Sequence, residues 1–326
     1  MEKLQSVERY HTNDSGRTLP CTAGARTCRF IHGSTPAEAA ENWQQQMQQE
    51  LLPQAMSPEQ SKEHKLNHYR NMPLKNMNDR ELAETIILES EALGLDIQKV
   101  SKAIALASEL HAEQCRKGTR GNVTNPPYIE HPLRNTLRLI RLGCRDESTI
   151  NGSTLHDTVE DGSTVFVARK GWSKDETKDE SRARRELSVH IEVSFGKETA
   201  EIVLAVTNDL QPHNKSKPLS VEQKHAIYVN HLKEQILKNP GAFLVKISDF
   251  IDNATGLHHG VGSIDPTKLS NQAKKYLKAI PVFQEGLDSL KIPLPAHSKE
   301  LLQKCLGETQ RRLERITNGW DGKEKI

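Results

Sequence analysis

Apolar residues recur at three- and four-residue intervals along most of the chain after Asn78, which is the spacing of amphipathic helices. Asn78 or Asp79 can cap a first helix that Gly94 closes, because short polar side chains start helices well and glycine ends them. The same periodicity predicts further helices at residues 97–110, 133–142, 202–206, 227–237, 269–283 and 301–316. No long stretch alternates apolar and polar residues as a strand would. We therefore predict an all-α fold, a helical bundle.

The first 77 residues differ from the rest, and we expect them to form a small N-terminal appendage to a domain that spans residues 78–326. The appendage carries two histidines and two cysteines that could hold a structural Zn²⁺ ion: His11, Cys21, Cys28 and His32. The cysteines are spaced more widely than in a zinc knuckle, so a polar leader without metal is the favoured interpretation. Residues 42–60 are rich in Gln and Glu and are predicted to form a helix and then a linker. Recruitment of a protein partner by this appendage is a hypothesis.

Composition and charge exclude several classes of protein. Basic and acidic side chains nearly balance, 45 against 43, so no global field points to nucleic acid or to an acidic membrane surface. No stretch approaches the ~20 apolar residues of a transmembrane helix, and the N-terminus lacks the apolar core of a signal peptide. The five cysteines are odd in number and scattered, which fits reduced thiols better than a disulfide framework. We therefore expect a cytoplasmic protein.

The densest group of chemically active side chains lies in Thr154-Leu-His-Asp-Thr-Val-Glu-Asp-Gly162. His156 and Asp157 offer one imidazole and one carboxylate, a mixed set that suits Mn²⁺, Fe²⁺ or Zn²⁺. On a helix, Glu160 and Asp161 lie one turn further along the same side, where carboxylates can orient a water molecule or move its proton. An isolated His-Asp pair most often lies on the solvent-exposed face of a helix and binds no metal. Here, three other segments could complete a site.

Each of the other three segments places a histidine, a carboxylate or a basic pair where the local sequence suggests a structural role as well as a functional one. Pro127-Tyr-Ile-Glu-His131-Pro places a histidine before a proline, where a turn or a helix entry is expected. Asp249, in Lys246-Ile-Ser-Asp249-Phe-Ile-Asp252-Asn253, follows an apolar run, and a carboxylate on the buried side of a helix is costly unless it is paired or ligating. The helix that ends near His111 continues into Gln114-Cys-Arg116-Lys117, whose basic pair could simply interact with the helix C-terminus.

In this order, the four segments resemble the HD-domain hydrolases of the Rel/SpoT group, which cleave the stringent-response alarmone (p)ppGpp. The resemblance covers residues 95–257, roughly half of the chain, and it implies that the predicted bundle is an HD domain. Fewer than seventy residues follow Leu257, which is too few for the synthetase and regulatory domains of the long enzymes. The chain is therefore expected to be a small, hydrolase-only relative.

The resemblance also implies a role for each motif residue. The family's ligands for one Mn²⁺ ion fall on four side chains: His131, His156, Asp157 and Asp249. Glu160 and Asp161 match the pair that activates or positions the attacking water. Arg116 and Lys117 match a basic pair that lies against the guanine base, and Asn253 matches an asparagine that contacts the nucleotide.

The implied reaction is metal-assisted hydrolysis of the 3′-pyrophosphate of (p)ppGpp, which gives GDP or GTP and pyrophosphate. The expected substrate is thus a small nucleotide. Two alternatives stay open. A related HD phosphohydrolase could act on another nucleotide, as an NADPH 3′-phosphatase does. A catalytically silent nucleotide-binding adaptor could use the N-terminal segment for partners, although such modules usually lose metal ligands or the Glu-Asp pair.

The chain departs from the family pattern in three places. Residues 118–125 form a longer loop than usual, which we interpret as tolerated surface rather than as a lid. Residues 168–190 form an insertion dense in charge of both signs, for which a solvated helix or a disordered loop is favoured over a rim that contacts substrate phosphates. Residues 208–216 fit only loosely, which leaves the substrate preference open. His111 is not among the ligands that the resemblance implies, and we expect a packed or hydrogen-bonded histidine there.

Overall fold

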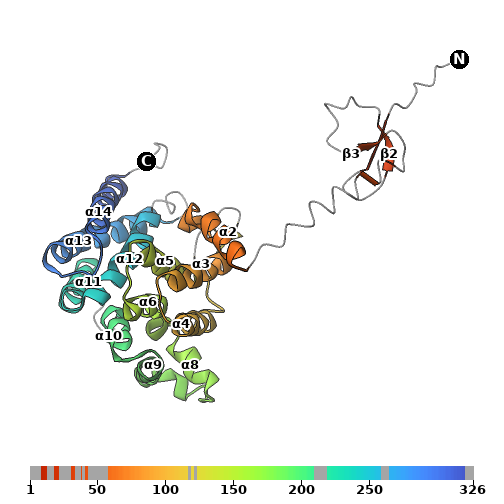
Figure 1. The fold of residues 1–326 in the computed structure, drawn as a ribbon. Helices are drawn as coiled ribbons and strands as arrows, with labels where there is room; N and C mark the ends of the chain where they lie inside the picture. Colours follow the sequence, from red (N-terminus) through yellow and green to blue (C-terminus); the bar gives the residue numbers. More distant parts are fainter. Residues whose placement is uncertain are drawn as a thin grey trace. The chain divides into compact units, whose positions relative to one another are not determined.

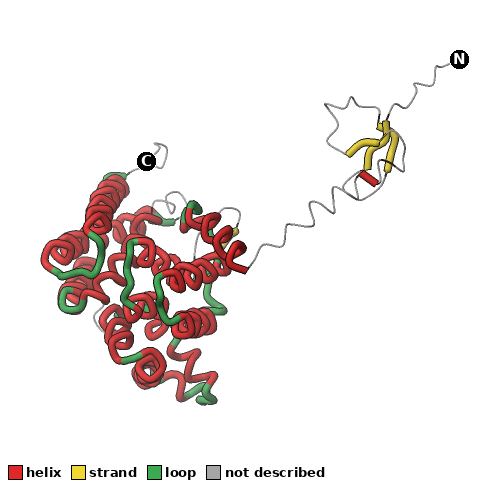
Figure 2. The backbone as a smooth tube through the Cα atoms, viewed as in Figure 1, coloured by secondary structure: helices red, strands yellow, loops and turns green. Residues whose placement is uncertain are grey.

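The structure is a computed structural model of the 326-residue chain, and it describes residues 9–12, 18–21, 31–33, 38, 41–42, 58–116, 119–120, 123–208, 219–257 and 264–319. Contacts divide the chain into two units, Met1–Lys65 and Leu66–Ile326. The first unit carries short strands and the second is built from helices (Figures 1 and 2).

The N-terminal unit contains a small antiparallel sheet in the order β2-β1-β3. Its strands are β1 (Arg9–Thr12), β2 (Thr18–Cys21) and β3 (Ile31–Gly33). The register sets the Cα of His11 opposite that of His32, and the Cα of Arg9 opposite that of Cys21. We did not predict these strands, because three or four residues are too few for an alternating pattern to stand out. Cys28, the one member of the suggested zinc set that these strands do not contain, lies outside the described residues. So does most of the helix predicted at residues 42–60.

Apart from one pair of two-residue strands, at residues 119–120 and 123–124, the regular structure of the remaining described chain is helical, which confirms the predicted all-α class for the main domain. Its helices are α2 (Pro58–Arg70), α3 (Asp79–Ala92), α4 (Ile97–Leu110), α5 (Glu130–Arg141), α6 (Glu147–Leu155), α7 (Thr158–Asp161), α8 (Ser163–Arg169), α9 (Glu180–Phe195), α10 (Lys197–Val206), α11 (Val221–Ile236), α12 (Pro240–Gly256), α13 (Pro266–Ser289) and α14 (Ala296–Thr317). Short 3₁₀ turns lie at η1 (Leu74–Asn76) and η2 (Glu176–Lys178).

Several helix ends follow directly from the local sequence. Asn78 caps α3 through a capping box, in which its Oδ1 accepts from the Glu81 N–H at 2.9 Å while the Glu81 carboxylate accepts from the Asn78 N–H at 2.8 Å. Gly94 and Gly143 follow α3 and α5 with φ of +75° and +85°, a left-handed conformation that favours glycine. Asn239 follows the helix predicted at residues 227–237. It also caps the next, with Pro240 in the first turn of α12.

Helix α12 is the central element of the bundle (Figure 1). It packs against α5, α6, α10, α11, α13 and α14, and it is buried along nearly its whole length. Most of its buried residues are apolar, as expected for a helix surrounded by others. The buried charged residues of α12 are Lys246, Asp249 and Asp252. Burying charge in this way is costly, so these three positions mark the part of the bundle where function is to be sought.

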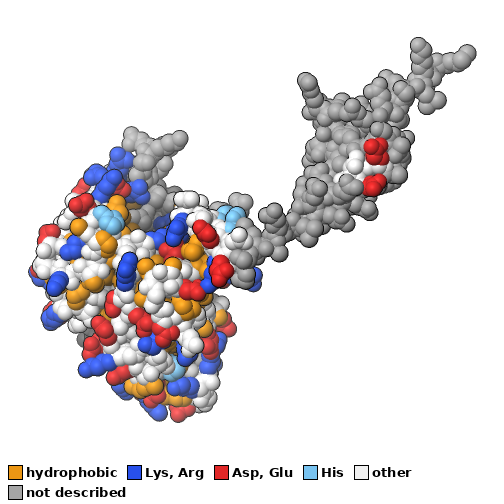
Figure 3. Space-filling model, in the orientation of Figure 1, with side chains coloured by type: hydrophobic (Ala, Val, Ile, Leu, Met, Phe, Trp, Pro, Cys, Tyr) orange, Lys and Arg blue, Asp and Glu red, His pale blue; other side chains and the backbone are white. Residues whose placement is uncertain are grey.

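Two of the departures from the family pattern take definite form. The loop at residues 118–125 carries a two-stranded antiparallel pair, β4 (Thr119–Arg120) with β5 (Val123–Thr124). The charged insertion contains η2 and the start of α9, so it is helical from Glu180 onward, with Ala183 and Leu187 buried. The choice between a solvated segment and a rim that contacts substrate phosphates stays a prediction. Acidic and basic side chains are interspersed over the face of the helical unit in Figure 3. Among the described residues, no helix is both long and apolar enough to cross a membrane.

Candidate active site

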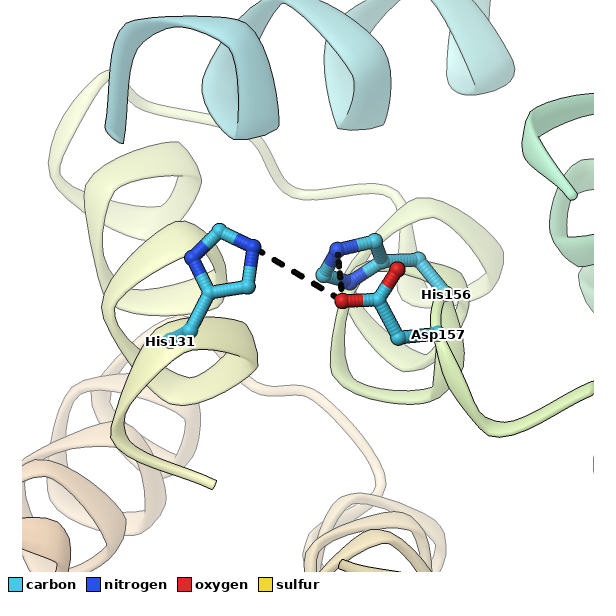
Figure 4. A group of neighbouring side chains, drawn as sticks. All are labelled: His131, His156 and Asp157. Atoms are coloured by element: carbon cyan, nitrogen blue, oxygen red, sulfur yellow. Dashed lines mark ion pairs between the residues drawn. The ribbon is translucent and has the colours of Figure 1, made fainter. Parts of the chain in front are cut away.

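Four side chains from three parts of the bundle converge beside α12. His131 lies in the first turn of α5, as the following proline predicted. His156 and Asp157 occupy the junction at which α6 ends and the short helix α7 begins. Figure 4 shows the His131 imidazole on one side and the neighbouring His156 imidazole and Asp157 carboxylate on the other, pointing toward one another. Asp249 completes the group from the buried side of α12.

The distances within this cluster are those of a compact donor set. One ligand atom from each of His131, His156 and Asp157 lies within 4.8 Å of the others, so these three could hold a metal ion. The Nε2 of His131 is 3.7 Å from Asp157 Oδ2, and the Nε2 of His156 is 3.1 Å from the same oxygen. Asp249 Oδ1 lies 3.0 Å from His131 Nε2 and 3.9 Å from His156 Nε2. All four side chains that the sequence predicted as ligands are therefore brought together.

The state of His156 provides a direct test of whether the cluster fits a divalent cation. Its Nδ1 donates to the backbone carbonyl of Ser153 at 2.8 Å. Its buried Nε2 makes no well-aligned hydrogen bond, although Asp157 Oδ2 lies 3.1 Å away. A fixed Nδ1–H leaves the Nε2 lone pair directed into the cluster, which is the arrangement that a metal-ligating histidine needs. Two imidazoles and two carboxylates form a mixed N/O set that fits a borderline-to-hard divalent ion.

The electrostatics of the cluster favour a positive charge at its centre. Burial would raise the pKa of Asp249, but the Lys246 ammonium, 2.9 Å from Oδ2, and the His131 imidazole hold it well below its usual range. Burial likewise opposes ionisation of Asp157, yet the His156 and His131 imidazoles keep its pKa low. Burial lowers the pKa of His156, but the Asp157 and Asp249 carboxylates outweigh it and raise that pKa to about 9. A proton or a metal cation would satisfy the same two carboxylates.

Glu160 and Asp161 lie on α7, one turn beyond Asp157, and their environments differ. The Glu160 carboxylate is half-buried and accepts hydrogen bonds from the backbone N–H and the side-chain amide of Asn208, at 3.0 and 2.9 Å. Asp161 is exposed, and partial desolvation together with the charges of Asp157 and Glu160 raises its pKa to about 6. Because Asp161 is exposed, the two like charges are the firmer cause of this shift. One carboxylate is thus held in place while the other is close to exchanging a proton at neutral pH.

Two of the three predicted nucleotide-contacting residues, Arg116 and Asn253, lie at the edge of the same cluster. Arg116 is half-buried, and its guanidinium donates to Asp252 Oδ2 at 3.0 Å and to Asn253 Oδ1 at 2.6 Å. The Asn253 side-chain amide donates in turn to Asp249 Oδ1 at 2.6 Å. Arg116 is therefore joined to the cluster by direct hydrogen bonds. Lys117, its predicted companion, lies outside the described residues.

His111 behaves as the sequence analysis expected. It is buried, its Nδ1 lies 2.8 Å from Gln114 Oε1, and its ring packs against that of Tyr128 with centroids 4.9 Å apart.

Several residues of the site were missed from the sequence. Tyr128 donates its hydroxyl proton to Asp157 Oδ2 at 2.8 Å. Lys246 pairs with Asp249, and Asn208 holds Glu160. Two signals were available: Tyr128 lies within the motif around His131, and Lys246 precedes Asp249 by one helical turn. Asn208 carries no local signal, because it reaches the site only through the packing of α10.

Known proteins with related sequences match about half of the chain. The chain is 30% identical over 160 residues to the guanosine-3′,5′-bis(diphosphate) 3′-pyrophosphohydrolase of Aquifex aeolicus, a match that takes in 49% of this chain and 18% of that protein. It is 28% identical over 164 residues to the guanosine-3′,5′-bis(diphosphate) 3′-pyrophosphohydrolase MESH1 of Xenopus tropicalis, which covers 50% of this chain and 71% of that protein. Over about half of its length the chain is therefore similar to guanosine-3′,5′-bis(diphosphate) 3′-pyrophosphohydrolases.

Other comparisons complete this result. MESH1 of Danio rerio is 28% identical over 159 residues, which covers 48% of this chain and 68% of that protein. A solved structure of a metazoan ortholog of SpoT that hydrolyzes ppGpp matches 68% of this chain and 96% of that chain, with 20% identity and a TM-score of 0.44. No family model matches the chain. The chain thus spans less than a fifth of the length of the Aquifex aeolicus relative and about seven-tenths of the Xenopus tropicalis one.

Proposed function

We propose that this protein hydrolyses the 3′-pyrophosphate of (p)ppGpp, releasing GDP or GTP and pyrophosphate. The observation that carries the proposal is the convergence of His131, His156, Asp157 and Asp249 on one point, where the buried Nε2 of His156 faces Asp157 without a well-aligned hydrogen bond. In this proposal the four side chains hold one Mn²⁺ ion. A divalent ion at this place supplies Lewis acidity, which offsets the charge that develops on the phosphoryl group and makes water a better nucleophile.

The remaining side chains position the water and the nucleotide and transfer the proton. Glu160, fixed by Asn208, orients the attacking water. Asp161, whose pKa is raised to about 6, is suited to accept a proton and return it near neutral pH. Arg116 and Lys117 bind the guanine base, with the planar Arg116 guanidinium available for stacking. Asn253 contacts the nucleotide from α12.

Two further assignments belong to the same proposal. A cytoplasmic location fits a small-nucleotide substrate and cysteines that stay reduced. A structural Zn²⁺ ion in the N-terminal unit is supported by a register that pairs the Cα of His11 with that of His32 on neighbouring strands. Metal analysis of the purified chain, with Cys21→Ser and Cys28→Ser alongside, tests the zinc assignment. Stoichiometric zinc that is lost in both variants supports it, and a zinc-free wild type contradicts it.

The main test uses the purified chain with Mn²⁺ and ppGpp, and follows the nucleotide products by anion-exchange chromatography. GDP and pyrophosphate are expected from the wild type, and neither from Asp157→Ala or from wild type treated with a chelator. Asp288→Ala, an exposed aspartate on α13, is the matched control and should retain full activity. If the protein binds Mn²⁺ but leaves ppGpp intact, the substrate assignment is wrong, and a panel that includes NADPH replaces it. If Mn²⁺ does not bind, the site assignment itself fails.

A further inference from the structure

Asp252 is the most heavily hydrogen-bonded carboxylate of the site, although no motif assigns it a role. It is 3% exposed. Its Oδ2 accepts from His131 Nδ1 at 2.8 Å, from Arg116 Nη1 at 3.0 Å and from Arg134 Nη2 at 3.1 Å. Its Oδ1 accepts from Arg134 Nε and from Arg138 Nη2, both at 3.1 Å. Both oxygens are therefore committed, and the carboxylate has a single orientation.

The contact with His131 determines how that imidazole is presented to the cluster. A carboxylate can only accept at this contact, so the proton lies on Nδ1. The opposite nitrogen, Nε2, faces Asp249 and Asp157. A cation can displace a proton from Nε2, because both neighbours there are themselves candidate ligands. At Nδ1, by contrast, no position is left for a cation. Three arginines already donate to the oxygens of Asp252, the partner of this nitrogen.

The surroundings keep Asp252 ionised and thus a strong acceptor. Burial would raise the pKa of Asp252, but the hydrogen bond from His131 and the charges of Arg134 and Arg138 hold it well below its usual range. A buried carboxylate without such partners would bear the full desolvation penalty of an ion. The arginines therefore explain how this carboxylate can lie buried beside the cluster.

The two histidines of the cluster differ in what holds them. His156 donates to the backbone carbonyl of Ser153, whereas His131 donates to a full negative charge. A carboxylate partner makes an imidazole more basic and a stronger ligand than a carbonyl partner does.

We propose that Asp252 is the positioning residue of the metal centre, which fixes the tautomer and ring orientation of His131 and strengthens its Nε2 as a ligand. The inference rests on the proposed metal site but not on the identity of the substrate. A simpler role is conceivable, in which Asp252 only joins α5 to α12 through its arginines. That role predicts a loss of stability without any effect on the protonation of His131.

The first experiment needs no variant. In the ¹⁵N-labelled, metal-free full chain at pH ~9, above the ordinary imidazole range, a long-range ¹H–¹⁵N correlation spectrum shows which ring nitrogen of His131 carries the proton. The proposal requires the Nδ1–H tautomer. A His131 that carries its proton on Nε2, or that averages between the two tautomers, overturns it.

The second experiment measures Mn²⁺ affinity from the free-ion EPR signal in wild type, Asp252→Asn and Asp288→Asn. An amide at position 252 keeps the shape but places an NH₂ group against guanidinium donors in either orientation. We expect Asp252→Asn to bind Mn²⁺ about 10- to 100-fold more weakly, the usual effect of losing such a partner. Asp288→Asn, exposed on α13, should bind like wild type.

The outcomes separate this proposal from the proposed activity. A folded Asp252→Asn protein with wild-type Mn²⁺ affinity overturns the positioning role, whatever the protein hydrolyses. Weakened Mn²⁺ binding in a protein that leaves ppGpp intact supports the role and contradicts only the substrate. If Asp252→Asn does not fold, the tautomer of His131 in the wild type decides the question.

Discussion

At the residue scale, Glu160 is the clearest example of a side chain whose role differs from that of its neighbours. It lies close to the candidate ligands, but its carboxylate is committed to Asn208 rather than to the cluster. We therefore expect Glu160→Gln to bind Mn²⁺ as the wild type does and to lose ~10²- to 10⁴-fold in kcat, the usual contribution of a positioned acid or base. Single-turnover hydrolysis and Mn²⁺ titration together measure the two effects.

Glu186→Gln, an exposed change of the same chemistry on α9, is the control for this experiment and should alter neither quantity. A Glu160→Gln protein that no longer bound Mn²⁺ would show that Glu160 is a ligand and that its separate role is wrong.

Lys75 carries a charge that the fold disfavours. Burial lowers its pKa from 10.5 to about 8, and Arg134, Arg138 and Arg116 add to this, against the opposing effect of Asp252. Between these two pH values the unfolded chain holds the proton and the folded chain does not, so stability rises with pH through this window. Below about pH 8 both states are protonated and the full penalty applies, up to about 3 kcal/mol for a shift of this size.

Lys75→Met should therefore raise the melting temperature at pH 7, and the gain should shrink as the pH rises toward 10.5. Thermal unfolding at several pH values measures this, with Lys291→Met, an exposed position, as the control. A gain that is equal at every pH would mean that the packing of the new side chain, and not the lost charge, is responsible.

At the element scale, three helices approach closely at Ile202 on α10. A Cβ atom added at Gly152 on α6 would lie 2.7 Å from Ile202 Cγ2, and one added at Gly241 on α12 would lie 2.6 Å from Ile202 Cδ1. Glycine is required at both places because the helices have no room for a methyl group. Helix α6 ends at His156, so this close packing also sets the position of a candidate ligand.

We expect Gly152→Ala to destabilise the protein by ~1–3 kcal/mol through overpacking, partly offset by the ~1 kcal/mol that alanine gains in a helix. Gly307→Ala is the matched control on α14, where a Cβ would meet its nearest neighbour at 3.8 Å, so it should stabilise instead. Urea unfolding of both, and of Gly152→Ala combined with Ile202→Ala, tests the assignment. The double variant should lose less than the sum of its parts, and simple additivity would argue against the contact.

The sequence was informative about elements in proportion to their length and periodicity. The capped helix from Asn78 to Gly94 and the helix from Ile97 were predicted almost to the residue, because caps and apolar spacing are local signals. The four candidate ligands were found through motifs, and the structure brings them together. Asp252 was not assigned a role, since its partners on α5 are more than a hundred residues away in sequence. Contacts of that range depend on packing, which the pattern of a single chain does not encode.

At the scale of the whole molecule, the place where the helical domain begins can be tested by truncation. Contacts separate the two units after Lys65, whereas composition predicted a boundary after residue 77. The segment between these points interacts with the bundle. Arg141 donates to the backbone carbonyls of Tyr69 and Met72, and Met77 is completely buried.

Removal of residues 1–57 should thus leave the melting temperature and Mn²⁺ affinity of the helical unit unchanged. Removal of residues 1–77 should cost about 3 kcal/mol or more, because it opens a cavity at Met77 and strips Arg141 of two acceptors. Differential scanning calorimetry of both truncated chains measures the difference. Equal melting temperatures would place the domain boundary after residue 77, as the composition predicted.

The contacts of Arg116 imply that nucleotide binding and metal binding affect each other. Its guanidinium touches Asp252 and Asn253, and these in turn hold His131 and Asp249. A base that stacks on Arg116 would restrict this residue and, through both contacts, two of the candidate metal ligands. Thermodynamic linkage then requires reciprocity: if the nucleotide tightens the metal, the metal tightens the nucleotide by the same factor. Release of the product would then weaken the hold on the metal, so the bound ion could exchange with ions in solution once in each turnover.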